Sequence, residues 1–161
     1  MPVTGSVVAY QDRLIDMLAF QNGGVGSLEL VDMVLVNAGE SGWSCTGIVK
    51  LAQRFLLELL TEQGSIFYEP NRGTTFMTDL RFQRVRTTVD AEYSFALGLQ
   101  QAKLQLQLEE TDDMPDDEKF GRAELISLTL APQDTLKIRL NLFSLAGTGV
   151  TLVLPLETTL G

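Results

Sequence analysis

Residues Gly47–Ser65 form the stretch GIVKLAQRFLLELLTEQGS, which carries the clearest periodic pattern in the chain. Its apolar residues recur at steps of three and four, as they do along one face of an amphipathic helix. They are Ile48, Leu51, Ala52, Phe55, Leu56, Leu59 and Leu60. Ser44 or Thr46 is suited to cap the start, and Gly64 offers the left-handed conformation that commonly closes a helix. We therefore expect a helix that begins near Thr46 and is closed at Gly64.

The segment that follows this helix, Ser65 to Thr75, has the composition of a loop. Gly64, Pro70 and Gly73 are the residues that force the chain to turn, because glycine tolerates left-handed conformations and proline fixes its own backbone angle. We predict that these three residues are structural turns.

Two further helices are expected after the loop. Phe76 to Arg86 is long enough for a short helix and carries three arginines. A longer helix is predicted from Asp90, which can cap its start, to about Leu108. Its buried stripe is defined by residues at steps of four, three and four. These are Phe95, Leu99, Ala102 and Leu106.

The last forty residues have the pattern of an antiparallel meander. Ala123 to Leu130, Thr135 to Phe143 and Val150 to Leu156 are three strand-like runs separated by short turn sequences. In the last two runs apolar residues alternate with others, so one face of the sheet is expected to pack on the helices. Such a meander leaves at least one edge strand with unpaired backbone groups, which either needs protection or accepts a strand from another chain.

The chain before the first helix is predicted to contribute one buried strand, Leu28 to Val36, which is rich in valine and leucine. Residues 1–27 are predicted to be a flexible arm. We thus expect an α+β protein with a single domain over residues 28–161, made of an N-terminal strand, two to three helices and a C-terminal antiparallel β-meander.

The composition of the chain excludes several classes of function. A formal net charge of −9 disfavours nucleic acid and anionic membranes as partners, and no apolar run is long enough to span a bilayer. The single cysteine forms neither an internal disulfide nor a zinc site alone. The absence of histidine excludes every catalytic arrangement that uses an imidazole. We therefore predict a protein that is not an enzyme and has no cofactor or bound metal, in the cytoplasm because no cleaved signal peptide is recognised.

Carboxylates and arginines are the remaining candidates for residues of a functional site. The run EETDDMPDDE from Glu109 to Glu118 lacks the order of a calcium loop and is interpreted as a solvated loop. A glycosidase uses two carboxylates as acid and base and requires an apolar pocket to raise the pKa of one of them. Glu58 and Glu69 are the only candidates near apolar residues. Glu58 falls off the apolar stripe and is expected to point to water.

A basic patch is expected around the short second helix. Two interpretations of it stay open: a docking surface for an acidic partner or for the acidic loop of a neighbouring subunit, and a solvated helix face. The residues are Arg72, Arg81, Arg84 and Arg86.

The order of these elements, with GIVKLAQRFLLELLTEQGS and a loop ending in EPNRGT (Glu69 to Thr74), resembles the sheath-initiator proteins of contractile phage tails. The resemblance covers about Leu28 to Leu156. These are small baseplate wedge proteins with a lysozyme-like fold and a structural role, with relatives in type VI secretion systems. The family's Glu-Pro-Arg triplet after the long helix is absent, and the acidic run occupies that region.

The resemblance implies a virion protein assembled in the host cytoplasm, with the tail sheath protein, baseplate wedge proteins and the tail tube as partners. Strand addition to the meander would then start the sheath, while the four arginines dock on wedge proteins. The expected sheath-contact residues are Leu136, Ile138, Leu140, Val150, Leu152 and Leu154. Two alternatives are a tail terminator or neck connector protein and, from another class, a cell-wall hydrolase.

Overall fold

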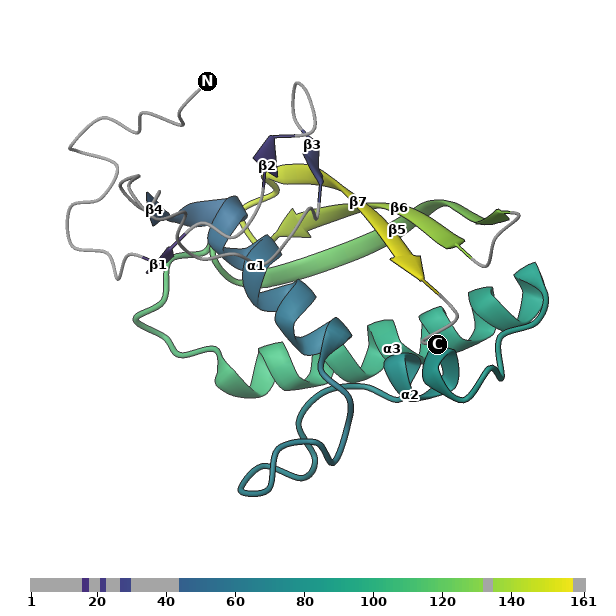
Figure 1. The fold of residues 1–161 in the computed structure, drawn as a ribbon. Helices are drawn as coiled ribbons and strands as arrows, with labels where there is room; N and C mark the ends of the chain where they lie inside the picture. The colour runs from purple at the N-terminus through teal and green to yellow at the C-terminus, as the bar shows by residue number, and fades with distance from the viewer. Residues whose placement is uncertain (1–15, 18–20, 23–26, 30–43, 132–134, 158–161) are drawn as a thin grey trace, which may run out of the picture.

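The structure is a computed structural model that describes residues 16–17, 21–22, 27–29, 44–131 and 135–157. Within these residues three helices pack beneath a five-stranded sheet, so the architecture is α+β, as predicted (Figure 1). A separate two-stranded pair is formed by β1 (Asp16–Met17) and β4 (Ser44–Cys45).

The predicted meander is confirmed, and its three strands are the longest in the sheet. They are β5 (Phe120–Ala131), β6 (Thr135–Ser144) and β7 (Gly149–Glu157), paired antiparallel in chain order. On the far side of β7, β3 (Ser27–Glu29) pairs in parallel with residues 151–153, and β2 (Gln21–Asn22) pairs with β3. The order β2-β3-β7-β6-β5 places β6 in the interior and β5 at an edge.

The N-terminal predictions fall largely on residues outside the described part of the chain. Of the predicted strand, Leu28 and Glu29 lie in β3, and residues 30–36 are outside the described residues. Of the predicted arm, residues 16–17, 21–22 and 27 lie in the short strands β1, β2 and β3, and the others are outside the described residues.

The first predicted helix is α1 (Gly47–Leu60), and its apolar stripe faces the core. Leu51, Ala52, Phe55, Leu56 and Leu59 are buried. Thr46 occupies the N-cap position without a side-chain hydrogen bond. The side chain of Glu118 takes that role, since its Oε1 accepts a hydrogen bond from the Gly47 N–H at 3.0 Å. At the other end Thr61 is the C-cap, so Gly64 lies beyond the helix rather than closing it.

The loop after α1 folds back against the end of the helix. Thr74 donates its N–H to the Thr61 carbonyl at 2.8 Å, and Gln63 donates to the Thr74 carbonyl at 3.0 Å. Gly73 sits between these contacts with a φ of +88°, and a Cβ there would lie 2.3 Å from the Thr61 oxygen. The turn therefore needs glycine both for its left-handed backbone and for the close approach. Pro70 lies on the exposed outer part of the same loop.

The short second helix, α2 (Phe76–Arg81), is five residues shorter than predicted. Gln83 adopts a φ of 54°, and this left-handed residue stops the helix. Arg84 and Arg86 consequently lie in the connection to the next helix, not on α2.

The long helix, α3 (Thr88–Glu109), begins two residues before the predicted start. Thr87 is the N-cap, and Asp90 completes a capping box by accepting hydrogen bonds from the Thr87 and Arg86 N–H groups. The Thr87 side chain and these backbone donors hold the pKa of Asp90 below its ordinary value.

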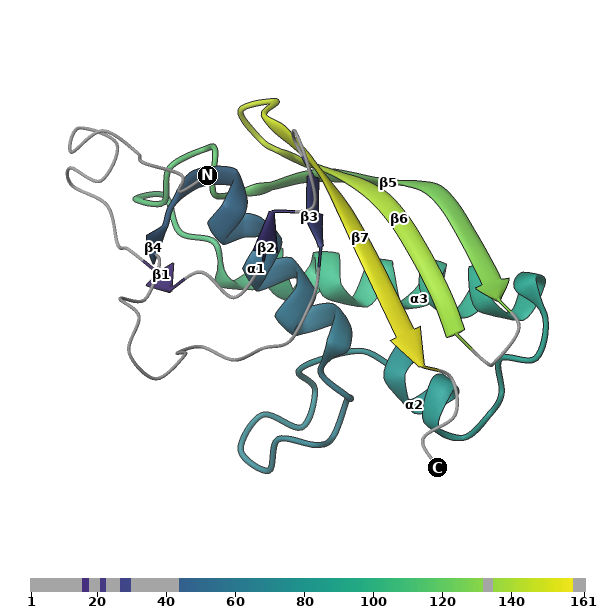
Figure 2. The same cartoon turned by 45° about the horizontal axis from the view of Figure 1, so that its top comes forward.

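The core lies between the helices and the inner face of the sheet. In α3 the predicted stripe is confirmed: Phe95, Ala102 and Leu106 are buried, and Leu99 packs against them. The Phe95 ring meets Phe76 edge to face at 5.7 Å. Figure 2 shows α3 running along the underside of β5, β6 and β7. Within the described residues, no helix is long and apolar enough to cross a membrane.

Candidate functional site

The residues predicted to contact a sheath protein lie in the core. The side chains of β6 and β7 named in that prediction point at the helices, and all but Val150 are fully buried. They are Leu136, Ile138, Leu140, Val150, Leu152 and Leu154. The backbone of β6 is also paired on both sides, with β5 and with β7. Contact with a partner through these side chains, or strand addition to β6, would require the sheet to open.

Among the described residues β5 forms one edge of the sheet, and the two-residue strand β2 forms the other. The inner side of β5 pairs with β6 along the whole strand, and among the described residues no strand pairs with its other side. Leu125 and Ile126 are partly exposed near its middle. Register shifts between Phe120 and Arg122 and between Leu125 and Ser127 interrupt the ladder. Such bulges limit uncontrolled pairing at an edge, while strand addition remains available where the ladder is regular.

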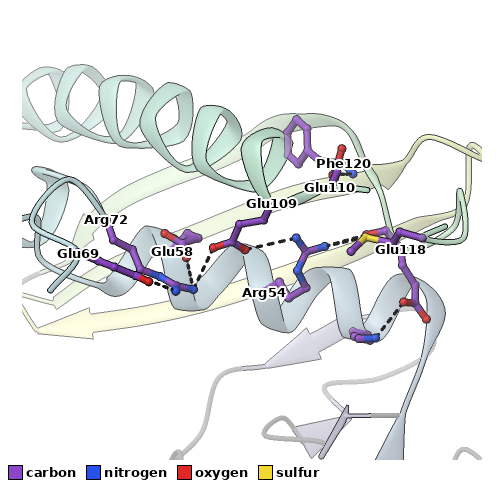
Figure 3. A network of polar contacts seen from close by, with 10 residues as sticks. Arg54, Glu58, Glu69, Arg72, Glu109, Glu110, Glu118 and Phe120 are labelled. Carbon is purple, nitrogen blue, oxygen red and sulfur yellow. Dashed lines mark hydrogen bonds and ion pairs between the residues drawn. The ribbon is translucent and has the colours of Figure 1, made fainter. Parts of the chain in front are cut away.

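The four predicted docking arginines belong to two separate places. Arg72 is engaged inside the molecule, where its guanidinium meets three carboxylates (Figure 3). Its Nη2 lies 2.6 Å from Oε1 of Glu58 and 3.3 Å from Oε1 of Glu109, and its Nη1 lies 3.0 Å from Oε2 of Glu69. The hydrogen bond that Arg72 donates to Glu69, with the nearby charges of Glu58 and Glu109, raises the pKa of Arg72 above its ordinary value. Arg72 therefore joins α1, the loop and the end of α3.

Glu58 is buried, contrary to the prediction that it points to water. Only 1% of its side chain is exposed, and among the described residues its Oε2 has no hydrogen-bond partner. A charge in this position needs the guanidinium of Arg72, because an unpaired buried carboxylate is costly. The helical periodicity located the apolar stripe correctly but gave no sign that a distant arginine covers this side of α1.

We call Arg72 and its three carboxylates the ion cluster. Arg54 extends it, because Arg54 lies 3.5 Å from Glu109 and donates a hydrogen bond to the Glu118 carbonyl at 3.2 Å. A surface hollow of about 370 Å³ adjoins the cluster. Its lining residues are Tyr68, Glu69, Pro70, Asn71, Arg72, Gln105 and Glu109. A glycosidase acid must keep its proton at neutral pH, which an apolar environment favours and an adjacent guanidinium opposes. Glu58 and Glu69 share one guanidinium, so this geometry fits a structural ion cluster better than an acid–base pair.

Of the other three predicted arginines, Arg81 and Arg84 flank an exposed aromatic ring, and Arg86 follows two residues after Arg84. We call Arg81, Phe82, Arg84 and Arg86 the Phe82 patch. The Phe82 side chain is 58% exposed. The guanidinium carbons of Arg81 and Arg84 lie 4.8 Å and 5.7 Å from the ring centroid. Arg81 also pairs with Glu62 at 2.8 Å. Sequence reasoning found these arginines but missed the phenylalanine between them.

The acidic run is only partly a solvated loop. Glu109 ends α3 and pairs with the two arginines of the cluster, and Glu110 accepts a hydrogen bond from the Phe120 N–H. Glu118 is buried and binds Lys50 at 3.0 Å as well as the start of α1. The middle of the run, including Asp112 and Asp113, is exposed. Within the described part of the chain, no group of three potential metal ligands gathers at one place.

Comparisons of the chain with models of protein families, with curated proteins and with solved structures found no match.

Proposed function

We propose that the chain is a structural baseplate protein of a contractile tail, with a lysozyme-like wedge fold, that docks on wedge proteins and initiates sheath assembly. The proposal starts from the sequence resemblance. It is supported by the order of elements after residue 44: the helix α1, a glycine-dependent loop, the long helix α3 and a terminal meander.

The observation that carries the proposal is the 12-residue edge strand β5. Strand addition supplies affinity through backbone hydrogen bonds and places little demand on side chains, which suits a template that passes its arrangement to a growing assembly. We therefore place the proposed sheath contact on the edge of β5, and not on the buried side chains of β6 and β7. Leu125 and Ile126 lie at the register shift in the middle of β5, and their exposed apolar side chains would lie beside a strand added to the regular stretch from Ser127 to Ala131.

The Phe82 patch is the proposed docking site for a wedge protein. An exposed aromatic ring flanked by arginines has the composition of an interface anchor, since aromatic residues and arginine dominate binding energy at many interfaces. The patch belongs to the helical side of the molecule, and β5 belongs to the sheet, so the two contacts are suited to different partners.

The test is an affinity pull-down of the tagged full chain from cells that produce the particles, followed by mass spectrometry. We expect sheath and wedge proteins with the wild type, loss of sheath with Leu125→Lys/Ile126→Lys, and loss of wedge proteins with Phe82→Ala. Leu145→Lys is the matched control, because Leu145 is an exposed leucine in the β6–β7 hairpin.

Equal recovery of sheath with the β5 variant and the wild type would disprove the role of the edge strand. Recovery of head-completion proteins in place of baseplate proteins would replace the proposal with the terminator or neck connector. Release of peptidoglycan fragments by the purified chain, abolished by Glu69→Gln, would instead favour the hydrolase.

A further inference from the structure

The helix α3 carries a second apolar stripe that faces away from the core. The side chains of this outer stripe are between 43% and 79% exposed. They are Val89, Tyr93, Leu97, Leu104 and Leu108. At about 100° per residue they fall within one arc of about 100°, nearly opposite the buried residues Phe95 and Ala102. A solvated helix usually shows polar residues on that side, so the outer stripe needs a covering partner.

The spacing of the outer stripe reads the same in both directions along the helix. Val89 and Leu108 lie equally far from the midpoint between residues 98 and 99, and so do Tyr93 and Leu104. Leu97 is matched in the same way by Gln100. When two copies of one helix pack antiparallel about a two-fold axis, each residue meets the residue at its mirror position. The outer stripe would then meet itself, apolar residue against apolar residue, with a leucine and glutamine pair beside the axis.

Charges at the two ends of α3 are arranged for the same pairing. Arg84 and Arg86 are exposed just before its N-terminus, and Asp112 and Asp113 are exposed just beyond its C-terminus. Antiparallel packing brings the basic end of one copy beside the acidic end of the other, and the two-fold axis repeats this contact at the opposite end. The arginines and aspartates thus complement each other across the pair, although the chain as a whole is acidic.

We propose that a second copy of this chain covers the outer stripe, in an antiparallel two-fold dimer built on α3. The symmetric spacing of the apolar residues would suit any helix with a matching face. The opposite charges at the two ends of α3 favour a second copy of this chain, because an antiparallel copy presents the complementary charge at each end. A single pair of helices buries an area at the low end of specific interfaces, so the dimer forms reversibly with concentration. This contact leaves the edge of β5 free, so it stands apart from the proposed sheath contact. It uses Arg84 and Arg86 of the Phe82 patch, so a second copy and a wedge protein would compete for these two arginines.

The first experiment measures the mass of the full chain by sedimentation velocity over a roughly hundredfold range of concentration. We expect the wild type to shift from monomer to dimer, and Leu104→Lys to raise the dissociation constant at least tenfold. Leu145→Lys is the matched control, because Leu145 is exposed to 60% and Leu104 to 59%. Its dissociation constant should equal that of the wild type. A wild type that stays monomeric throughout, or equal effects of the two variants, would overturn the proposal.

The second experiment tests the antiparallel arrangement by exchanging charges. Arg84→Glu/Arg86→Glu and Asp112→Lys/Asp113→Lys should each weaken self-association about tenfold, because like charges then face each other at both ends. Mixed in equal amounts, the two variants should form a heterodimer of nearly wild-type affinity, because opposite charges meet again at both ends. Circular dichroism establishes that each variant is folded. Weakened variants whose mixture shows no recovery would refute the antiparallel dimer.

Discussion

Replacing Arg72 with methionine tests whether the buried carboxylate of Glu58 depends on one guanidinium. In the wild type the two groups are 2.6 Å apart, with Glu58 1% and Arg72 35% exposed. Methionine keeps much of the length and apolar bulk of the arginine stem but removes the cation. Glu58 is then left inside the molecule as an unpaired charge.

The expected loss of stability follows from the burial of the two partners. Breaking a buried ion pair by removing one partner costs about 3–5 kcal/mol. Since water reaches one side of Arg72, the cost should be lower here, at about 2–3 kcal/mol. For a chain of this size that corresponds to a fall in melting temperature of about 4–12 °C. Glu58→Met should cost less than about 1 kcal/mol, because Arg72 keeps Glu69, Glu109 and water.

The double variant Glu58→Met/Arg72→Met completes the cycle. Two apolar side chains in place of a buried ion pair are often neutral, so its stability should lie within about 1 kcal/mol of the wild type and above that of Arg72→Met alone. Urea unfolding followed by circular dichroism measures all four proteins. A single Arg72→Met variant as stable as the wild type, or a double variant less stable than Arg72→Met, would show that Glu58 does not depend on this partner.

Three other substitutions test the loop, the helix cap and the start of α1. Gly73→Ala should destabilise by more than about 3 kcal/mol in urea unfolding, whereas Gly64→Ala, which has a similar φ but open space for a Cβ, should cost about 1 kcal/mol. The pKa of Asp90 is lowered in the folded state, chiefly by the Thr87 side chain, so its contribution is complete above the unfolded pKa of about 3.9 and is lost as the pH falls through the folded value. The stability difference between the wild type and Asp90→Asn should therefore be constant near neutral pH and shrink below about pH 4, and a pH-independent difference would contradict this. Glu118→Gln keeps an acceptor at the start of α1 but removes the charge beside a lysine, and thermal unfolding should show a loss of about 1–2 kcal/mol.

Elements with a strong local period were predictable from the sequence. The apolar steps of α1 and the alternation in β6 and β7 each depend on neighbours within a few residues, and both sets of side chains lie where the period placed them. Element ends were less predictable. The helix α2 stops where Gln83 turns left-handed, and no proline or glycine marks that position.

The features that the sequence did not predict depend on contacts between residues that are distant along the chain. The order of strands, with β7 paired to β3 in parallel, covers the outer side of β7 and leaves β5 at an edge among the described residues. The pattern within each strand carries no information about that order. In the same way, the charge of Glu58 is tolerated only because a loop residue fourteen positions later returns to it. The predicted sheath-contact residues share an apolar alternation, and that same alternation buries them in the core.

The helix α3 shows why a surface site was hard to recognise. Apolar residues on two opposite faces cancel in any measure of one-sided amphipathicity, so the periodic pattern predicts only the stripe that faces the core. The structure separates the two faces: one contacts α1, α2 and the sheet, and the other is open. The described part of the chain covers the face with Phe95, Ala102 and Leu106, and the outer stripe is exposed within it. Among the described residues, apolar side chains are exposed at the outer stripe, at the Phe82 patch and on β5, while the ion pairs of Arg72 hold the loop to α1 and α3. We infer that other subunits cover these exposed apolar surfaces when the protein is part of an assembly.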